Sequence, residues 1–188
     1  TATAVASSAL TVGGTVTLGN GTTFTGGSFT HNIAGNWVNN GATVALTGTT
    51  INLNGAGTQT MGGSSSTTFT TLTINGAVTN NGTIQVNTAL AGSSTLTQGT
   101  GSTLTLNFTG APGITGLDAS SYTNTVNYTF AGTQTVKGVN YSTLVLGGTS
   151  AKTLQTGTTS IGGNLTLSGT ASTTLVISLA VAGQAAVN

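Results

Sequence analysis

The feature that most constrains the fold is a period-two alternation of apolar and polar residues in many short segments. Leu72-Thr73-Ile74, Leu104-Thr105-Leu106 and Leu165-Thr166-Leu167 each place leucine or isoleucine on one side of an extended backbone and threonine on the other. This alternation is typical of half-buried β-strands. No window has apolar residues at helical spacing, and the 30 glycines would weaken a helix. The pattern therefore predicts an all-β protein made of short strands.

Turn-forming dipeptides separate these segments. Asn-Gly pairs begin at Asn20, Asn40, Asn54, Asn75 and Asn81, and Gly-Gly pairs begin at Gly13, Gly26, Gly62, Gly147 and Gly162. Such residues accept left-handed backbone conformations, so the chain can turn a corner there. Apolar residues followed by these signals recur at about twenty residues, the length of one turn of a β-solenoid. We therefore predict a parallel β-helix of about nine irregular turns, on the order of 45 Å long.

An internal repeat supports a regular architecture. Residues 50–76 recur 75 residues later as residues 125–148, with Ala56-Gly57-Thr58-Gln59-Thr60 matching Ala131-Gly132-Thr133-Gln134-Thr135. A β-sandwich of two related halves is the alternative, because sandwich strands also recur at about 8 to 12 residues. The excess of Gly, Thr and Asn favours the solenoid, where side chains stack in ladders. In either case residues 1–188 form a single elongated domain.

The near absence of charge excludes several classes of function. The chain has two lysines, no arginine and one acidic residue, and charged residues make up 2% of it, against roughly 25% in an ordinary domain. Nucleic-acid binding needs clustered lysine and arginine, so we expect no nucleic-acid partner. There is no cysteine for a disulfide or a thiolate metal site. No run of 18 apolar residues exists, so no membrane span is predicted.

The sequence also predicts no enzyme, cofactor or metal. Asp118 is the one acidic side chain, so a pair of catalytic carboxylates cannot form. A serine triad would require His31 and Asp118 to meet a serine. His31 lies in Thr30-His31-Asn32-Ile33, which we interpret as a strand with a surface imidazole. A metal site needs more histidine or acidic residues than the chain has. The glycine-rich stretches lack the Gly-Lys-Ser/Thr sequence that ends a phosphate-binding loop.

Two kinds of covalent modification remain candidates. Lys137 and Lys152 are possible amines for an intramolecular isopeptide bond, with Asp118 as acceptor or helper; the alternative is two solvated lysines and an aspartate in a turn. Six N-glycosylation sequons match the number that composition predicts, and they matter only in a source that glycosylates exported proteins. They begin at Asn20, Asn81, Asn107, Asn127, Asn140 and Asn164.

Two surface-binding functions are weighed against ordinary strand packing. Thr-x-Thr motifs such as Thr58-Gln59-Thr60 and Thr95-Leu96-Thr97 would order water in an ice-binding protein if they stacked on one flat face. Threonine is also the favoured polar residue of strands. Trp37, the one tryptophan, is a candidate for stacking on a sugar, although a tryptophan in a strand more often packs in a core or an interface.

Three phrases carry a resemblance to known proteins. Gly57-Thr58-Gln59-Thr60, residues 69–76 and residues 161–167 resemble the short β-strand repeats of large bacterial cell-surface proteins, including autotransporter-like and haemagglutinin-like adhesins. The resemblance covers most of residues 30–170. It implies a parallel β-helix, exposure at the cell surface, and adhesion or assembly, and it carries no catalytic residues.

The C-terminal segment 174–188 is a candidate for joining subunits. It is apolar and β-prone, and the chain has almost none of the Lys, Pro or charge that usually protects sheet edges. We expect strand addition between copies, head to tail, to give an extracellular homopolymeric filament, pilus-like or adhesive. Host or neighbouring cell surfaces or glycans are further expected partners. The candidate interface residues are Leu175, Val176, Ile177, Leu179 and Val181.

Other readings of the whole chain stay open. The chain starts Thr1-Ala2 without methionine, which we interpret as processing and export. One alternative is a β-helical passenger fragment of a larger surface adhesin. The other is an ice- or carbohydrate-binding surface protein.

Overall fold

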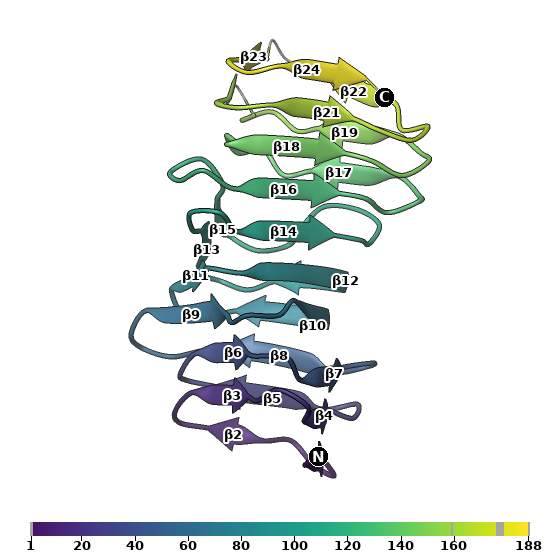
Figure 1. The fold of residues 1–188 in the computed structure, drawn as a ribbon. Helices are drawn as coiled ribbons and strands as arrows, with labels where there is room; N and C mark the ends of the chain where they lie inside the picture. Colours follow the sequence, from purple (N-terminus) through teal and green to yellow (C-terminus); the bar gives the residue numbers. More distant parts are fainter. Residues whose placement is uncertain (1, 159, 176–178, 188) are drawn as a thin grey trace.

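The chain winds into a β-solenoid of about nine turns, stacked from the N-terminus to the C-terminus (Figure 1). The structure is a computed structural model that describes residues 2–158, 160–175 and 179–187. Every strand pairing among these residues is parallel. The predicted parallel β-helix is therefore confirmed, and the β-sandwich alternative is wrong, because sandwich sheets are antiparallel.

Three walls enclose the core, and a turn contributes a segment to each. The first wall contains β1 (Thr3–Val5), β4 (Thr23–Thr25), β7 (Thr43–Ala45), the first parts of β10 (Thr67–Ile74) and β12 (Thr83–Ala91), β14 (Thr103–Leu106), β16 (Thr125–Tyr128), β18 (Thr143–Leu146), β21 (Leu165–Leu167) and β24 (Ala185–Val187). The second wall contains β2 (Thr11–Val12), β5 (Thr30–Ile33), β8 (Thr50–Leu53), the second parts of β10 and β12, β17 (Gln134–Val136), β19 (Lys152–Leu154) and β22 (Thr173–Leu175). The third wall contains β3 (Val16–Leu18), β6 (Trp37–Asn39), β9 (Gln59–Gly62), β11 (Val78–Asn80), β13 (Thr95–Gln98), β15 (Gly116–Asp118), β20 (Ser160–Ile161) and β23 (Ala180–Val181).

The long strands β10 and β12 straighten one corner and join two walls. Residues 71–74 of β10 pair with β8, whereas residues 67–69 pair with the first part of β12, and the register shifts between Phe69 and Thr71. The ten-stranded sheet therefore passes from the second wall to the first at these two strands. Partners on successive turns lie between 17 positions apart (Thr67 and Ile84) and 24 positions apart (Trp37 and Met61). This range confirms the irregular spacing of about twenty residues.

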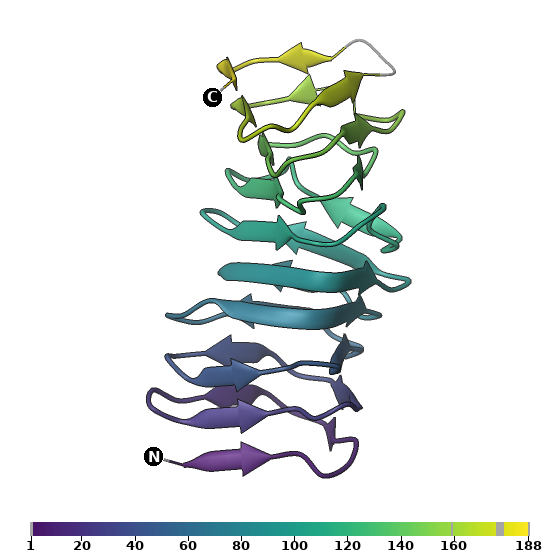
Figure 2. The same ribbon diagram turned by 90° about the vertical axis from the view of Figure 1, so that its right-hand side faces the viewer.

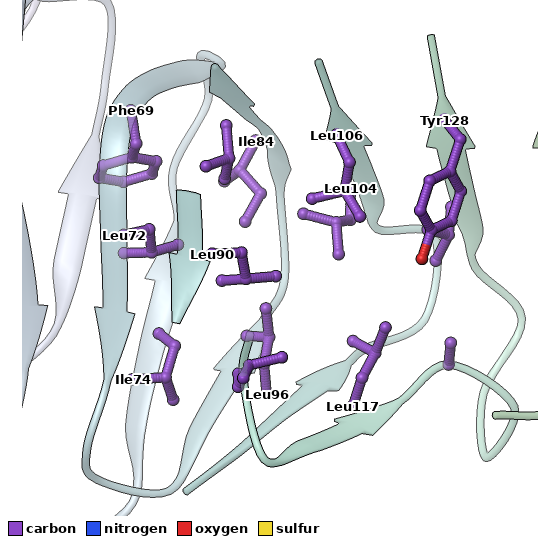
Figure 3. Close-up of a cluster of buried hydrophobic side chains, with 14 of the residues drawn as sticks. Phe69, Leu72, Ile74, Ile84, Leu90, Leu96, Leu104, Leu106, Leu117 and Tyr128 are labelled. Carbon is purple, nitrogen blue, oxygen red and sulfur yellow. The ribbon is translucent and has the colours of Figure 1, made fainter. Parts of the chain in front are cut away.

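The alternation in the sequence sends one residue in two into a continuous apolar column. Figure 3 shows side chains from different walls, such as Phe69, Leu90 and Leu117, directed into the same interior. Leu72, Leu96 and other members of this column are fully buried. Burial of apolar surface is the main force that holds such a stack together, at about 25 cal/mol per Å². The core therefore extends along the solenoid rather than forming one compact centre.

Glycine is required where two corners of successive turns meet closely. Gly63 has a φ of 116°, and a Cβ there would lie 2.1 Å from the carbonyl oxygen of Asn39. Gly92, with a φ of 124°, would meet the carbonyl oxygen of Ile74 at the same distance. Any larger residue would both strain the backbone and push the turns apart.

The 75-residue repeat encodes a strand–corner–strand unit rather than a whole number of turns. In the first copy the corner connects β8 in the second wall to β9 in the third wall. In the second copy it connects β16 in the first wall to β17 in the second wall. The repeat is therefore structural, as the sequence indicated, but its two copies lie on different walls and do not stack on one another.

Candidate functional site: corners, flank and the two ends

Two glutamines bind the corners of successive turns together. The Gln59 side chain donates from Nε2 to the carbonyl oxygens of Ile33 and Gly35 one turn below, at 2.9 and 2.5 Å, and accepts the Gly55 N–H at Oε1. We call this three-bond arrangement the corner clamp. This glutamine belongs to the 75-residue repeat, which was its one signal in the sequence.

Gln134 makes the same clamp on another wall. Its Nε2 donates to the carbonyl oxygens of Leu106 and Phe108, at 3.0 and 2.9 Å, and its Oε1 accepts the Phe130 N–H at 3.0 Å. The offsets from the preceding strands equal those of Gln59. The repeated Ala-Gly-Thr-Gln-Thr sequence thus supplies a buried amide that satisfies three backbone groups of a corner.

Lys152 occupies the clamp position one turn above Gln134. The two residues are partners in the register of β17 and β19, and the Lys152 side chain is fully buried. Its Nζ donates to the carbonyl oxygens of Phe130 and Gly132, at 2.6 and 3.0 Å. Burial lowers the pKa of this amine below its ordinary value of 10.5. The interpretation of Lys152 as a solvated lysine is therefore wrong.

A closed network of hydroxyl groups lies beside Lys137. The Tyr141 hydroxyl donates to the Lys137 carbonyl oxygen at 2.8 Å, so the Tyr128 hydroxyl donates to Tyr141 at 3.1 Å and accepts the Lys137 N–H at 3.0 Å. Burial raises the pKa of Tyr128 to about 12. Burial, with a contribution from Tyr128, also raises the pKa of Tyr141.

The described contacts do not bring either lysine to Asp118. The Lys137 Nζ donates to the Ile114 carbonyl oxygen at 2.6 Å, and Lys152 is bound within its corner. Asp118 instead accepts the N–H groups of Ser120 and Ser121 at Oδ1, at 3.2 and 3.1 Å, which matches the predicted turn aspartate. The isopeptide bond stays a prediction without support from these hydrogen bonds.

His31 is buried, so its interpretation as a surface imidazole is wrong. It alternates in phase with Ile33, and the shared phase places both side chains in the core. The Nε2–H donates to the Gly26 carbonyl oxygen at 2.7 Å, and Nδ1 accepts the Leu10 N–H at 3.0 Å. His31 therefore links two turns and is not placed for a serine triad.

Trp37 is also buried, which removes it as a sugar-stacking residue. Only 1% of its surface is exposed, and its Nε1–H donates to the Thr67 hydroxyl at 3.2 Å. Its ring packs against Phe69, with ring centroids 5.5 Å apart. The tryptophan thus packs in the core, the alternative that the sequence left open.

The six sequon asparagines divide by exposure. Asn20, Asn81, Asn140 and Asn164 are exposed, whereas Asn107 and Asn127 are half-buried. Asn127 donates from Nδ2 to the Thr105 hydroxyl at 3.2 Å, so a glycan there would break a contact between turns.

The ice-binding alternative needs threonines stacked on one flat face. Thr60, Thr79 and Thr97 do stack in register on the third wall. That column is one residue wide and continues as Asp118, not as threonine.

The two ends of the solenoid carry unpaired sheet edges. Figure 2 shows these ends at the bottom and the top of the stack. Among the described strands, β1, β2 and β3 at one end, and β22, β23 and β24 at the other, each pair with a single strand. Four large hydrophobic side chains of the described residues are exposed, and three lie in these terminal turns: Val5 at 66%, Leu10 at 37% and Val187 at 82%. All charged side chains lie between residues 118 and 152, so neither end has the charges that usually protect an edge.

The described residues of the predicted joining segment lie in the last turn of the solenoid. Leu175 pairs with Leu154, and Val181 pairs with Ile161. Leu179 and Val181 pack partly buried against the core, so they are not available as a separate apolar strand. Val176 and Ile177 lie outside the described residues.

The described residues hold no cluster of three or more His, Cys, Asp or Glu side chains that could bind a metal. A helix long and apolar enough to cross a membrane does not occur in the described part of the chain. No protein-family model matches the sequence, and comparison with curated proteins and with solved structures finds no significant match.

Proposed function

We propose that this chain is a structural subunit of an extracellular filament in which copies stack end to end. The observation that carries the proposal is the placement of exposed apolar side chains and unpaired parallel edges at the two ends. A parallel edge is a template for another strand, and a contact that does not close on itself generates a filament. The uncharged ends would meet without repulsion between like charges.

Under this proposal the strand that makes the joint is β24 (Ala185–Val187). β24 lies in the first wall, one position beyond β23 in the third. If the three walls continue into a second copy, β2 of that copy pairs with β22 in the second wall, and its β3 pairs with β23 in the third wall. In that arrangement β24 already occupies the place in the first wall that β1 of the second copy would need. β24 therefore replaces that β1, whose three residues are exposed, and pairs with β4 of the second copy, which is the one strand that β1 pairs with. The added strand is thus residues 185–187 rather than 174–181.

Val187→Lys tests the joint. Because Val187 is 82% exposed, the substitution leaves the fold intact while it places a charge on the β24 edge. Negative-stain microscopy should show uniform filaments for the original chain and none for Val187→Lys. Thr88→Lys, an exposed position on β12 in the middle of the solenoid, is the matched control and should polymerise normally.

Deletion of residues 1–6 sharpens the test. It removes β1 and frees its position for β24, so we expect faster filament growth than with the full chain. Deletion of residues 174–188 is less informative, because it exposes edges of β19, β20 and β21 that offer the same backbone groups. A monodisperse monomer of the unmodified chain at high concentration would overturn the proposal.

The passenger fragment of a larger adhesin is the second candidate. The same open edges favour it, because further turns of one chain would cover them as well as a second copy would. In that case the isolated chain would still stack, but the longer natural chain would be a monomer of greater length. Mass measurement of the native protein distinguishes the two.

A further inference from the structure

A groove on the flank of the solenoid contains the chain's one acidic side chain. It has a volume of about 610 Å³ and lies outside the third wall, far from the ends of the stack in sequence. Its lining includes Thr79, Asn81, Thr97, Asp118, Ser121 and Tyr122. Its size is in the range of small-molecule sites, roughly 300–1,000 Å³.

Strand register builds the floor of the groove. Thr79 of β11, Thr97 of β13 and Asp118 of β15 are partners on three successive turns. Their neighbours Leu96 and Leu117 are buried in the core, so alternation turns this column outward. The result is a row of two hydroxyl groups and one carboxylate, about 4.8 Å apart along the stack.

The corner after β15 contributes Ser121 and Tyr122 to the lining of the groove. Asp118 holds this corner by accepting the N–H groups of Ser120 and Ser121. The buried Asn124 side chain donates from Nδ2 to the Tyr122 carbonyl oxygen at 2.7 Å, which fixes the backbone there. Tyr122 is 50% exposed and is the one large exposed hydrophobic side chain of the described residues that lies outside the terminal turns. The groove is thus lined by an exposed aromatic side chain as well as by polar groups.

The carboxylate is charged at neutral pH. Partial burial raises the pKa of Asp118, but hydrogen bonds from the Ser121 hydroxyl and from the Ser121 and Ser120 N–H groups outweigh this, and the net pKa is lowered. The two backbone bonds use Oδ1. A carboxylate has about four lone-pair sites, so it retains capacity to accept hydrogen bonds from a ligand.

From this arrangement we infer that the groove binds a neutral saccharide. Its hydroxyl groups would donate to the Asp118 carboxylate and exchange hydrogen bonds with Thr79, Thr97 and the Asn81 amide. The apolar face of a sugar ring would pack on Tyr122, since an aromatic side chain offers an apolar surface with a polar tip. An anionic ligand would be repelled by Asp118, and a calcium ion would have a single carboxylate where six to eight oxygen ligands are usual.

The site is independent of the proposed stacking and adds a function to it. The groove lies on β11, β13 and β15 in the middle of the stack, whereas the proposed joint would pair β24 with β4 of a second copy. A filament of copies would repeat the groove once per subunit, so weak binding by one site would become avid along the fibre.

A glycan array with the full chain provides the test. The probes are immobilised trimers of glucose, galactose, mannose and N-acetylglucosamine as neutral sugars, and a galacturonic acid trimer and sialyllactose as acidic ones. We expect binding of at least one neutral trimer, with the acidic probes at least tenfold weaker. No binding of any neutral trimer, or a preference for the acidic probes, would overturn the inference.

Variants locate the binding site on the protein. Titration calorimetry with the bound trimer should show affinity at least tenfold weaker for Tyr122→Ala and several-fold weaker for Asp118→Asn. Thr88→Ala, at an exposed position outside the groove, should bind as the original chain does. Circular dichroism verifies that each variant is folded. A folded Tyr122→Ala chain with unchanged affinity would refute this site, whatever the array shows.

Discussion

Gln134 and Lys152 perform the same task on neighbouring turns with different chemistry. They are partners in register, and each side chain donates to two carbonyl oxygens of the corner below. The Gln134 amide also accepts the Phe130 N–H. The Lys152 ammonium has no acceptor atom, and it brings a charge to a fully buried position.

The difference separates two contributions to stability. A corner needs donors for its inward carbonyl oxygens, because an unpaired buried polar group is costly. An amide meets that need without charge, whereas an ammonium meets it at the cost of desolvation. Gln59 has the same three bonds as Gln134 on a different wall. The corner therefore requires hydrogen-bond donors, and the lysine supplies them at a larger desolvation cost than the amide does.

The largest effect is expected from removing a complete clamp. Gln134→Leu leaves two carbonyl oxygens and one N–H without their partner, and each unpaired buried group costs about 1–3 kcal/mol. We expect the free energy of unfolding, from urea titration, to fall by about 3–5 kcal/mol. Gln59→Leu should lower the free energy of unfolding by a similar amount, since Gln59 makes the same three hydrogen bonds.

Gln85→Leu is the matched control for both clamps. Gln85 is half-buried on β12 and donates to the Asn87 side chain at the surface. Surface substitutions of this kind usually change the free energy of unfolding by less than about 0.5 kcal/mol. If Gln134→Leu cost no more than Gln85→Leu, the corner carbonyl groups would not depend on the clamp.

Substitutions of Lys152 give an intermediate effect. Lys152→Gln retains donors and removes the buried charge, so we expect it to be more stable than the original chain by about 1 kcal/mol. Lys152→Met removes the donors as well and should be less stable than Lys152→Gln by about 2 kcal/mol, or two hydrogen bonds. Urea midpoints measure both. Equal stability of the two variants would mean that the carbonyl oxygens of Phe130 and Gly132 need no donor.

The smallest expected effect is the pH dependence of the stability difference between Lys152→Gln and the original chain. Because burial lowers the pKa of Lys152 below 10.5, the folded chain releases the proton at lower pH than the unfolded chain. Stability therefore rises with pH between the lowered value and 10.5, and below that window the full cost of the charge is present. The advantage of Lys152→Gln over the original chain should shrink from pH 8 to pH 10, as measured by urea titration.

The buried tyrosines provide a background of opposite sign. The pKa of Tyr128 is raised to about 12, and that of Tyr141 is raised too. The unfolded chain thus loses these protons first, and stability falls as pH rises above 10. Both proteins share this loss, so it cancels in the comparison. An advantage that stays constant from pH 8 to pH 10 would show that Lys152 does not titrate there.

Much of the fold was predictable, because the solenoid repeats local rules. The alternation at Leu72 and Leu104 selects the inward residues, and glycine pairs such as Gly62-Gly63 mark corners. The same rule places His31 inward with Ile33, so the burial of His31 was also predictable from the alternation. The groove was not predictable, since Thr79, Thr97 and Asp118 lie 18 to 21 positions apart and meet only through register.

The amino-acid sequence by itself determined the short strands and the absence of charge from both ends of the chain, and it favoured the parallel stack over a sandwich. These properties follow from alternation, turn residues and composition, which act locally. Only the tertiary structure decided that the 75-residue repeat falls on two different walls, that Lys152 is buried, and that Tyr122 is exposed beside Asp118. Those outcomes depend on the length of each turn, because residues in neighbouring turns become partners only after the whole intervening turn has closed.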